Sequence, residues 1–329
     1  MTEKWRVFAA AVCGLVVICL SGCMMVDLSS LMTGELKEIT LTKSKGWGVS
    51  DKILLLDISG VIVGKSDGGL LSDSGCTPDY VKAALNKAVK DPNIKAIVLR
   101  IDSPGGEVSA IDNISHEIKQ IKNKTKLPVY SMIMGLGCSG GYHAACAGDR
   151  IYAQPSATVG SIGVILSIPK IAKLADKIGL EMVIVKSGNM KDIGNMFRDL
   201  TPEESEVLQL MITEHYHQFM DWIIDSRPAL KSRDQLKPIA DGRIYTSAQA
   251  LEHKLIDRIG YLDDAIADIK TAAKLNKYML VTYSYRSSED ANIYSPVSQR
   301  GPAQFNMVNI PLPIRMPSAK PGFYYLWQP

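Results

Sequence analysis

Residues 96–106 read AIVLRIDSPGG, a short apolar run that passes directly into a turn with one proline and two glycines. The apolar run Ala96–Ile101 has the length of a strand. After the turn, apolar residues recur at helical spacing at Val108, Ile111, Ile114, Ile118 and Ile121. The stretch therefore predicts a strand, a glycine turn and an amphipathic helix, which is the repeating unit of an α/β fold.

Further apolar runs bounded by turn residues lie on both sides of this unit, at Ile53–Ile58, Val129–Met134 and Met182–Val185. Runs of this kind suit strands that are buried on both faces of a sheet. Helix starts stand between them at Thr77-Pro78-Asp79 and at Thr201-Pro202-Glu203-Glu204, where a capping box opens a helix that should extend to about Ile224. The alternation predicts an α/β fold with mostly parallel strands.

The composition is that of a globular, enzyme-sized protein, with 329 residues of which 46% are hydrophobic and 22% charged. These values exclude disordered, collagenous and coiled-coil classes. A net charge of +3 without a basic run argues against a nucleic-acid partner. Six cysteines in this length do not make a disulfide scaffold, and we expect Cys76, Cys138 and Cys146 to be small buried apolar side chains.

The N-terminus combines two basic residues, Lys4 and Arg6, with the uncharged run Val7–Leu20 and the sequence Ser21-Gly22-Cys23. This order is typical of a secretory signal peptide. Its end resembles the bacterial lipoprotein signal, in which cleavage precedes a lipidated cysteine, here Cys23. A retained anchor is the alternative, because Val7–Val26 is uncharged and about twenty such residues can span a bilayer. Either interpretation places the rest of the chain outside the cytoplasm, at a membrane surface.

A candidate nucleophile follows the run Val129–Met134. Residues 137–141 read GCSGG and satisfy the G-x-S-x-G pattern, in which a sharp turn between a strand and a helix exposes a serine, here Ser139. A structural serine in a tight turn fits the same pattern. An α/β-hydrolase esterase would also need a later histidine, and only His253 suits, because the others share helices with the serine or with each other: His143, His215 and His217. A lysine of lowered pKa is the other possible base, but spacing alone does not select one.

Five motifs, which follow one another along the chain as they do in a known family, select one lysine. They are Asp102–Gly106 (DSPGG), Ser139–Tyr142 (SGGY), Thr158–Val164 (TVGSIGV), Lys186–Gly194 (KSGNMKDIG) and Ile239–Tyr245 (IADGRIY). With them the chain resembles, from about Ile53 to Ile269, the short form of the signal peptide peptidase A family. These are Ser-Lys serine peptidases of the Clp protease/crotonase-like superfamily.

The resemblance implies a role for each matched position: Ser139 as nucleophile, Lys191 as general base, the backbone N–H groups of Gly106 and Gly140 as oxyanion hole, and Ser161 as the hydroxyl that orients the lysine. It implies a ClpP/crotonase-like fold of repeated ββα units in a single catalytic domain, with neither metal nor cofactor. In short members the cooperating serine and lysine come from adjacent subunits of a homo-oligomeric ring.

The predicted organisation is a signal peptide or anchor at 1–22, a membrane-proximal linker at 23–50, a serine peptidase domain at 51–283 and a Pro-rich tail at 284–329. The tail ends in aromatic residues and should drape over a surface or reach a neighbouring subunit. The implied function is a membrane-associated endopeptidase of the bacterial cell envelope that cleaves apolar peptides such as remnant signal peptides. The alternatives are an esterase that uses Ser139 and His253, and a non-catalytic lipoprotein scaffold.

Three residues beside the matched motifs need an explanation. Cys138 and His143 stand where the family usually has alanine and tyrosine, so they are expected to alter the substrate pocket without removing a catalytic group. Asp192 follows Lys191 directly, and a carboxylate facing the lysine would stabilise its charged form. The side chain of Asp192 can point elsewhere, and the family that the chain resembles tolerates an aspartate at this position.

Overall fold

The computed structural model describes residues 35–65, 75–285, 290–297, 299 and 322–327. The chain divides into two units, Met1–Glu35 and Leu36–Pro329, and every element named below belongs to the second. The predicted signal run Val7–Leu20 and the predicted lipidation site Cys23 lie outside the described residues. Among the helices that are described, none is both long and apolar enough to cross a membrane.

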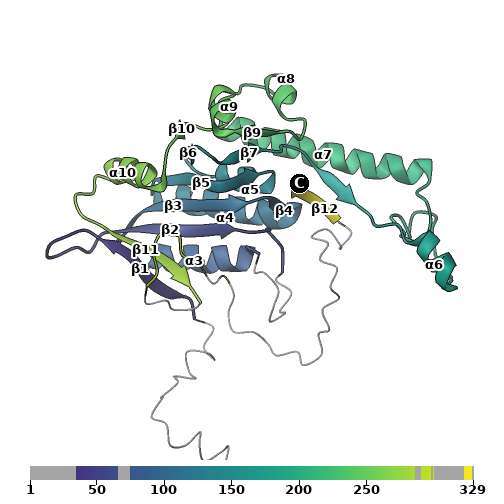
Figure 1. Ribbon diagram of the computed structural model, residues 1–329, viewed down its shortest axis with the longest axis horizontal. Helices are drawn as coiled ribbons and strands as arrows, with labels where there is room; N and C mark the ends of the chain where they lie inside the picture. The colour runs from purple at the N-terminus through teal and green to yellow at the C-terminus, as the bar shows by residue number, and fades with distance from the viewer. Residues whose placement is uncertain (1–34, 66–74, 286–289, 298, 300–321, 328–329) are drawn as a thin grey trace, which may run out of the picture. The chain divides into compact units, whose positions relative to one another are not determined.

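A nine-stranded sheet forms the centre of the second unit (Figure 1). Its main path runs through β1 (Lys37–Lys43), β11 (Met279–Ser284), β2 (Lys52–Ser59), β3 (Ile94–Ser103), β5 (Val129–Cys138), β6 (Arg150–Ala153) and β10 (Arg258–Ile259). From β5 the sheet also continues to β7 (Thr158–Gly160) and β9 (Ile244–Thr246). Strands β2, β3, β5 and β6 pair in parallel, which confirms the predicted α/β class.

Helices cover both faces of this sheet. One core lies between the sheet and the helices α3 (Pro78–Lys90), α4 (Val108–Thr125), α5 (Gly140–Ala145) and α7 (Pro202–Ser226). The other core lies against α10 (Leu262–Ala272). Successive residues of β2 belong to opposite cores, with Leu54 in the first and Leu55 in the second, as in a strand buried on both faces.

The helix starts read from the sequence are confirmed. The Thr77 hydroxyl caps α3 by accepting from the backbone N–H of Tyr80, and Pro78 occupies the first turn. Thr201 and Glu204 form the predicted capping box of α7. The remaining helices are short: α6 (Ala172–Ile178), α8 (Arg233–Leu236), a 3₁₀ turn at Lys237–Ile239, and α9 (Ser247–Glu252). The three predicted buried cysteines, Cys76, Cys138 and Cys146, are buried and unpaired.

The prediction of a buried strand at Met182–Val185 is wrong. The segment has no strand geometry, and its side chains are exposed, up to 96% at Val185. A four-residue apolar run does not distinguish a buried strand from an apolar surface, because both lack polar residues. The sheet instead takes β1 from the segment predicted as a linker.

The aromatic residues near the end of the chain form a strand and do not lie loosely over the surface. β12 (Gly322–Leu326) lies between β4 (Gly105–Glu107) and β8 (Ile165–Ser167) in a separate three-stranded sheet. Tyr324, Tyr325 and Leu326 are buried there. Figure 1 shows β12, in yellow, beside β4.

Candidate active site

Ser139 sits at the junction of β5 and α5. Its backbone has φ 52° and ψ −117°, an unfavourable conformation for a residue with a side chain, and it is only 1% exposed. The following glycines allow close packing, because a Cβ atom on Gly141 would lie 2.4 Å from the carbonyl oxygen of Ser103. The sequence thus folds into the sharp turn that the G-x-S-x-G pattern predicts.

Strand β7 brings Ser161 to the same place. Gly160 pairs with Cys138, and the Gly160 carbonyl accepts a 2.7 Å hydrogen bond from the Ser139 N–H. Ser161 has a left-handed backbone with φ 51°, and its N–H donates to the Arg243 carbonyl at 2.7 Å. Both serines line one cavity of about 550 Å³. Two predicted site residues, 22 positions apart in the sequence, therefore face one space.

The two glycine turns also meet. A Cβ atom on Gly105 would lie 2.7 Å from the backbone nitrogen of Gly140, so the DSPGG turn contacts the turn after Ser139. The Ser103 hydroxyl fixes the first turn, because it accepts from the Gly105 N–H at 3.1 Å and donates to the Gly60 carbonyl at 2.7 Å. The arrangement brings the DSPGG turn, which leads into β4 at Gly105, against the start of α5 at Gly140.

Lys191 is not brought to Ser139 within one chain. It lies in a turn between α6 and α7, where its backbone N–H donates to the Gly188 carbonyl at 3.1 Å. Its side chain is exposed, and it is absent from the residues that line the cavity of Ser139. Within the described part of the chain its ammonium group has no hydrogen-bond or ion-pair partner.

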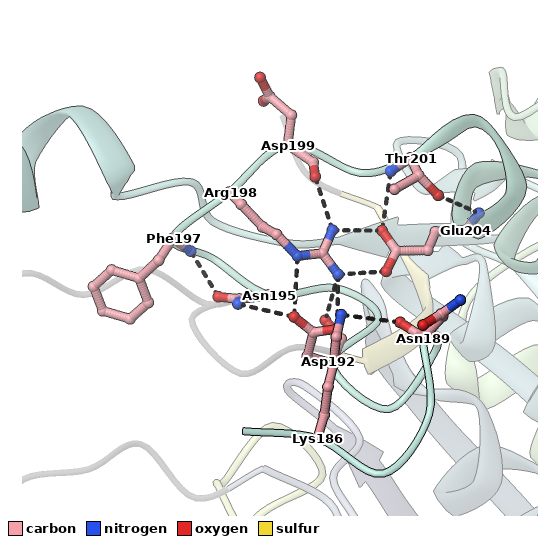
Figure 2. Close-up of polar contacts among 9 residues, drawn as sticks. All are labelled: Lys186, Asn189, Asp192, Asn195, Phe197, Arg198, Asp199, Thr201 and Glu204. Carbon is pink, nitrogen blue, oxygen red and sulfur yellow. Dashed lines mark hydrogen bonds and ion pairs between the residues drawn. The ribbon is translucent and has the colours of Figure 1, made fainter. Parts of the chain in front are cut away.

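The Asp192 carboxylate belongs to a polar network with Lys186, Arg198 and Asn195 (Figure 2). Its carboxylate accepts hydrogen bonds from the Lys186 ammonium group and from the Arg198 guanidinium. The distance from Arg198 Nη2 to Asp192 Oδ1 is 2.9 Å. Arg198 also reaches Glu204, the capping residue of α7, which is only 1% exposed. Hydrogen bonds from Arg198 and Lys186 hold the pKa of Asp192 well below its usual range, and Arg198 lowers the pKa of Glu204 to about 2. The network ties the turn that carries Lys191 to the start of α7, and it occupies the carboxylate next to the lysine.

We expect Arg198→Ala to lower peptidase activity by up to about 10²-fold, because the turn that carries Lys191, the predicted general base, loses its link to α7. The effect should appear in kcat more than in KM, together with faster amide hydrogen exchange over 186–200. Lys170→Ala is the matched control, since it removes only an exposed ion pair with Asp199, and such pairs contribute little. Equal activity of the two variants would show that the network does not position the lysine.

His143 forms part of an aromatic cluster and not of a catalytic pair. Its ring stacks on Trp222 with centroids 5.0 Å apart, and its Nδ1 lies 2.9 Å from the Ser115 hydroxyl. Burial lowers the pKa of His143 to about 3, so the ring is neutral near pH 7. Phe219 and Tyr325 complete the cluster. No sequence motif marks Phe219 or Trp222, although their spacing of three places both on one face of a helix.

The side chains of Cys138 and His253, the other candidates, make contacts that do not involve the Ser139 hydroxyl. Burial raises the pKa of the Cys138 thiol to about 12, and its Sγ donates to the Thr158 carbonyl. The ring of His253 packs edge-on against that of Tyr245, with centroids 4.9 Å apart, and His253 does not line the cavity of Ser139. In the described ranges no group of three or more His, Cys, Asp or Glu side chains could hold a metal ion. The esterase pairing of Ser139 with His253 therefore gains no support.

Comparisons with known proteins find two family models that match parts of this chain. Residues 121–276 match peptidase family S49, and residues 79–159 match the Clp protease family, in agreement with the predicted ClpP/crotonase-like fold. A candidate signal peptide peptidase SppA from Enterococcus faecium is 32% identical over 76% of this chain and 71% of its own length.

Two further relatives are longer proteins. Protease 4 of Salmonella typhi is 32% identical over 75% of this chain but only 42% of its own length. The chloroplastic serine protease SPPA of Arabidopsis thaliana is 35% identical over 62% of this chain and 30% of its own. The chain belongs to peptidase family S49 and is a serine peptidase.

Proposed function

We propose that this protein is an endopeptidase with a Ser-Lys dyad, in which Ser139 is the nucleophile and Lys191 the general base. The observation that carries the proposal is the position of Ser139, which faces one cavity with Ser161 and stands in a strained conformation just before two glycines that contact the DSPGG turn. A nucleophile needs a space that a carbonyl group can enter and nearby donors for the developing oxyanion, and the cavity that Ser139 lines offers such a space.

In the proposed reaction the Ser139 Oγ attacks the scissile carbonyl carbon while the neutral Lys191 amine takes the hydroxyl proton. The backbone N–H groups of Gly106 and Gly140 stabilise the oxyanion of the tetrahedral intermediate. The C–N bond then breaks, and the lysine returns the proton to the leaving amine. A water activated by the same lysine hydrolyses the acyl-enzyme, and the Ser161 hydroxyl orients the amine throughout.

We propose that Lys191 acts on Ser139 of an adjacent copy of the chain, in a homo-oligomeric ring. The separation of the two residues within one chain and the exposure of the lysine support this arrangement. The segment before it, Met182–Val185, presents apolar side chains to solvent, with Val183 79% exposed. A second copy packed on this segment would bury them and deliver the lysine together with its supporting network.

The proposed substrates are apolar peptides such as remnant signal peptides. Apolar side chains line the cavity near Ser139, among them Ile162, Val164, Ile165 and Ile212. The relative named as a signal peptide peptidase points to the same substrate class. We propose that lipidated Cys23, or a retained anchor over Val7–Val26, holds the protein at the membrane of the bacterial cell envelope, where such peptides are released.

Hydrolysis assays with two substrates test this function against an esterase. The full-length protein should cut an apolar, signal-peptide-like substrate at internal bonds, with the products identified by mass spectrometry. His253→Ala should keep near-wild-type activity, because the ring of His253 contacts Tyr245 and does not line the cavity. Preferred hydrolysis of a p-nitrophenyl ester that is lost with His253→Ala would support the esterase. No hydrolysis of either substrate would support the scaffold.

A further inference from the structure

The edge of the central sheet at which its parallel strands begin carries many lysines. Strands β11, β2, β3 and β5 are neighbours and run parallel, so the segments that precede them meet at one edge. Strand β1 ends at the same edge, because it pairs antiparallel with β11. Adjacent strands lie about 4.8 Å apart, so these segments share a front about 15 Å wide. Their seven exposed lysines and one exposed tryptophan are here called the basic edge: Lys43, Lys45, Lys90, Lys124, Lys126, Lys274, Lys277 and Trp47.

Acidic side chains do not balance the charge of the basic edge. Asp91, before β3, and Asp149, before β6, form ion pairs of 2.8 Å with two further lysines, Lys52 and Lys122. The segments before the four strands hold one other acidic residue, Asp51. In the part of the chain that the structure describes, none of the seven exposed lysines has an ion-pair partner. The net charge of the whole chain is only +3, so its positive charge is concentrated at this edge.

Trp47 projects from the loop between β1 and β2, and its side chain is 99% exposed. The glycines on either side, Gly46 and Gly48, have φ angles of 112° and 73°, which residues with a side chain rarely adopt. Figure 1 shows this loop at the left-hand edge of the sheet, where the connection from α10 to β11 also lies. The local sequence therefore presents a large aromatic ring to the surroundings at the edge that carries the lysines.

Two hydrogen bonds fix the base of this loop to the turn before β11. The Ser44 N–H donates to the Tyr278 carbonyl at 3.0 Å, and the Tyr278 N–H donates to the Ser44 hydroxyl at 3.1 Å. A Cβ atom on Gly46 would lie 2.8 Å from the ammonium nitrogen of Lys277. A positive charge therefore stands beside the residue that precedes Trp47, and the ring and the lysines form one surface.

The chemistry of this surface suits a bilayer that contains anionic lipids. The tryptophan ring, apolar with one N–H donor, is favoured at the level of the lipid headgroups, and lysines near an anionic leaflet are attracted to it. The predicted lipidation site also leaves the membrane within reach. Residues 23–37 can span up to about 48 Å, and β1 then leads to the basic edge.

We propose that the basic edge docks onto the surface of an anionic bilayer, with the ring of Trp47 among the lipid headgroups. The proposal rests on the membrane location given under the proposed function, and it is independent of the peptidase chemistry. The ten residues of β5 separate this edge from Ser139 by about 30 Å. A docked protein therefore receives peptides that have already left the bilayer.

Quenching by brominated lipids tests whether Trp47 enters the bilayer. The full-length wild type and Trp47→Phe are reconstituted into vesicles of phosphatidylcholine brominated on the acyl chains, with or without about 30% phosphatidylglycerol. In the anionic vesicles the wild type should lose more of its emission than the variant, by up to about a quarter of the total, because Trp47 is one of four tryptophans. The difference should disappear without phosphatidylglycerol and at about 0.5 M salt. Equal quenching of the two proteins in anionic vesicles would overturn the insertion of Trp47.

Amide hydrogen exchange tests the role of the lysines in the same vesicles without bromine. Exchange over 44–50 and 274–278 should be at least about 5-fold slower in anionic than in neutral vesicles for the wild type, and the Lys45→Glu/Lys277→Glu variant should lose this difference. Lys173→Glu/Lys177→Glu is the matched control, because it makes the same change of charge at exposed lysines of α6. It should behave as the wild type. Equal exchange of the wild type in both kinds of vesicle, or equal behaviour of the two charge variants, would overturn the docking surface.

Neither measurement requires hydrolysis, so its failure would leave the proposed peptidase chemistry intact. Vesicle flotation separates the outcome from the proposed anchor, since an anchored chain should float with neutral as well as anionic vesicles. If the wild type floats with neither kind, both the anchor and the docking surface are contradicted. If it floats with anionic vesicles alone, the anchor is contradicted, and loss of flotation in Lys45→Glu/Lys277→Glu but not in Lys173→Glu/Lys177→Glu would support the basic edge.

Discussion

Ser139→Ala is expected to lower kcat/KM for peptide hydrolysis by about 10⁴- to 10⁶-fold, the range found when a nucleophilic serine is removed. The hydroxyl that forms the acyl-enzyme is lost, and only the donors of the glycine turns remain to stabilise a direct attack by water. Steady-state hydrolysis of an apolar peptide, with product identification by mass spectrometry, measures this loss.

The Ser139→Ala substitution should remove the hydroxyl group without changing the backbone of the turn. Serine and alanine both carry a Cβ atom, so the unfavourable φ of 52° is equally strained in each, and the turn should persist. Circular dichroism spectra should therefore coincide. Ser156→Ala, at an exposed serine in the turn after β6, is the matched control and should retain full activity. An active Ser139→Ala protein would remove Ser139 from the mechanism.

Lys191→Ala is expected to lower kcat by about 10²- to 10⁴-fold, which is the usual contribution of a general base. Its thermal unfolding should match that of the wild type, because the Lys191 side chain is exposed. Lys177→Ala, at an exposed lysine in the last turn of α6, is the control and should be fully active. Near-wild-type turnover of Lys191→Ala would show that another group takes the proton from Ser139.

The sequence predicted well those parts of the fold that depend on local patterns. Buried strands such as Ile53–Ile58 and the capping box at Thr201 carry a signal within a few residues, because burial on both faces and cap chemistry are local requirements. The G-x-S-x-G turn is also a local pattern, because the backbone conformation of the turn requires its glycines. These local patterns place Ser139 at the end of a strand and the start of a helix.

Features that depend on contacts between residues far apart in the chain could not be predicted from local sequence patterns. The run Met182–Val185 looks like a buried strand, but no partner strand within the described chain covers it. The end of the chain gives the opposite case, because β12 is held by pairing with β4, more than two hundred residues earlier. Asp192 beside Lys191 suggested a problem for the base, and only the position of Arg198 shows that the carboxylate is already engaged.

Lys191 should reach Ser139 of a second copy, and complementation between two inactive variants tests this arrangement. Ser139→Ala and Lys191→Ala chains with different affinity tags are co-expressed, and assemblies that carry both tags are isolated. If each site takes its serine from one copy and its lysine from the next, random assembly restores about a quarter of wild-type activity. Replacing Lys191→Ala in the mixture by the Ser139→Ala/Lys191→Ala double variant should abolish this recovery. Mixed assemblies no more active than either variant alone would contradict a site shared between copies.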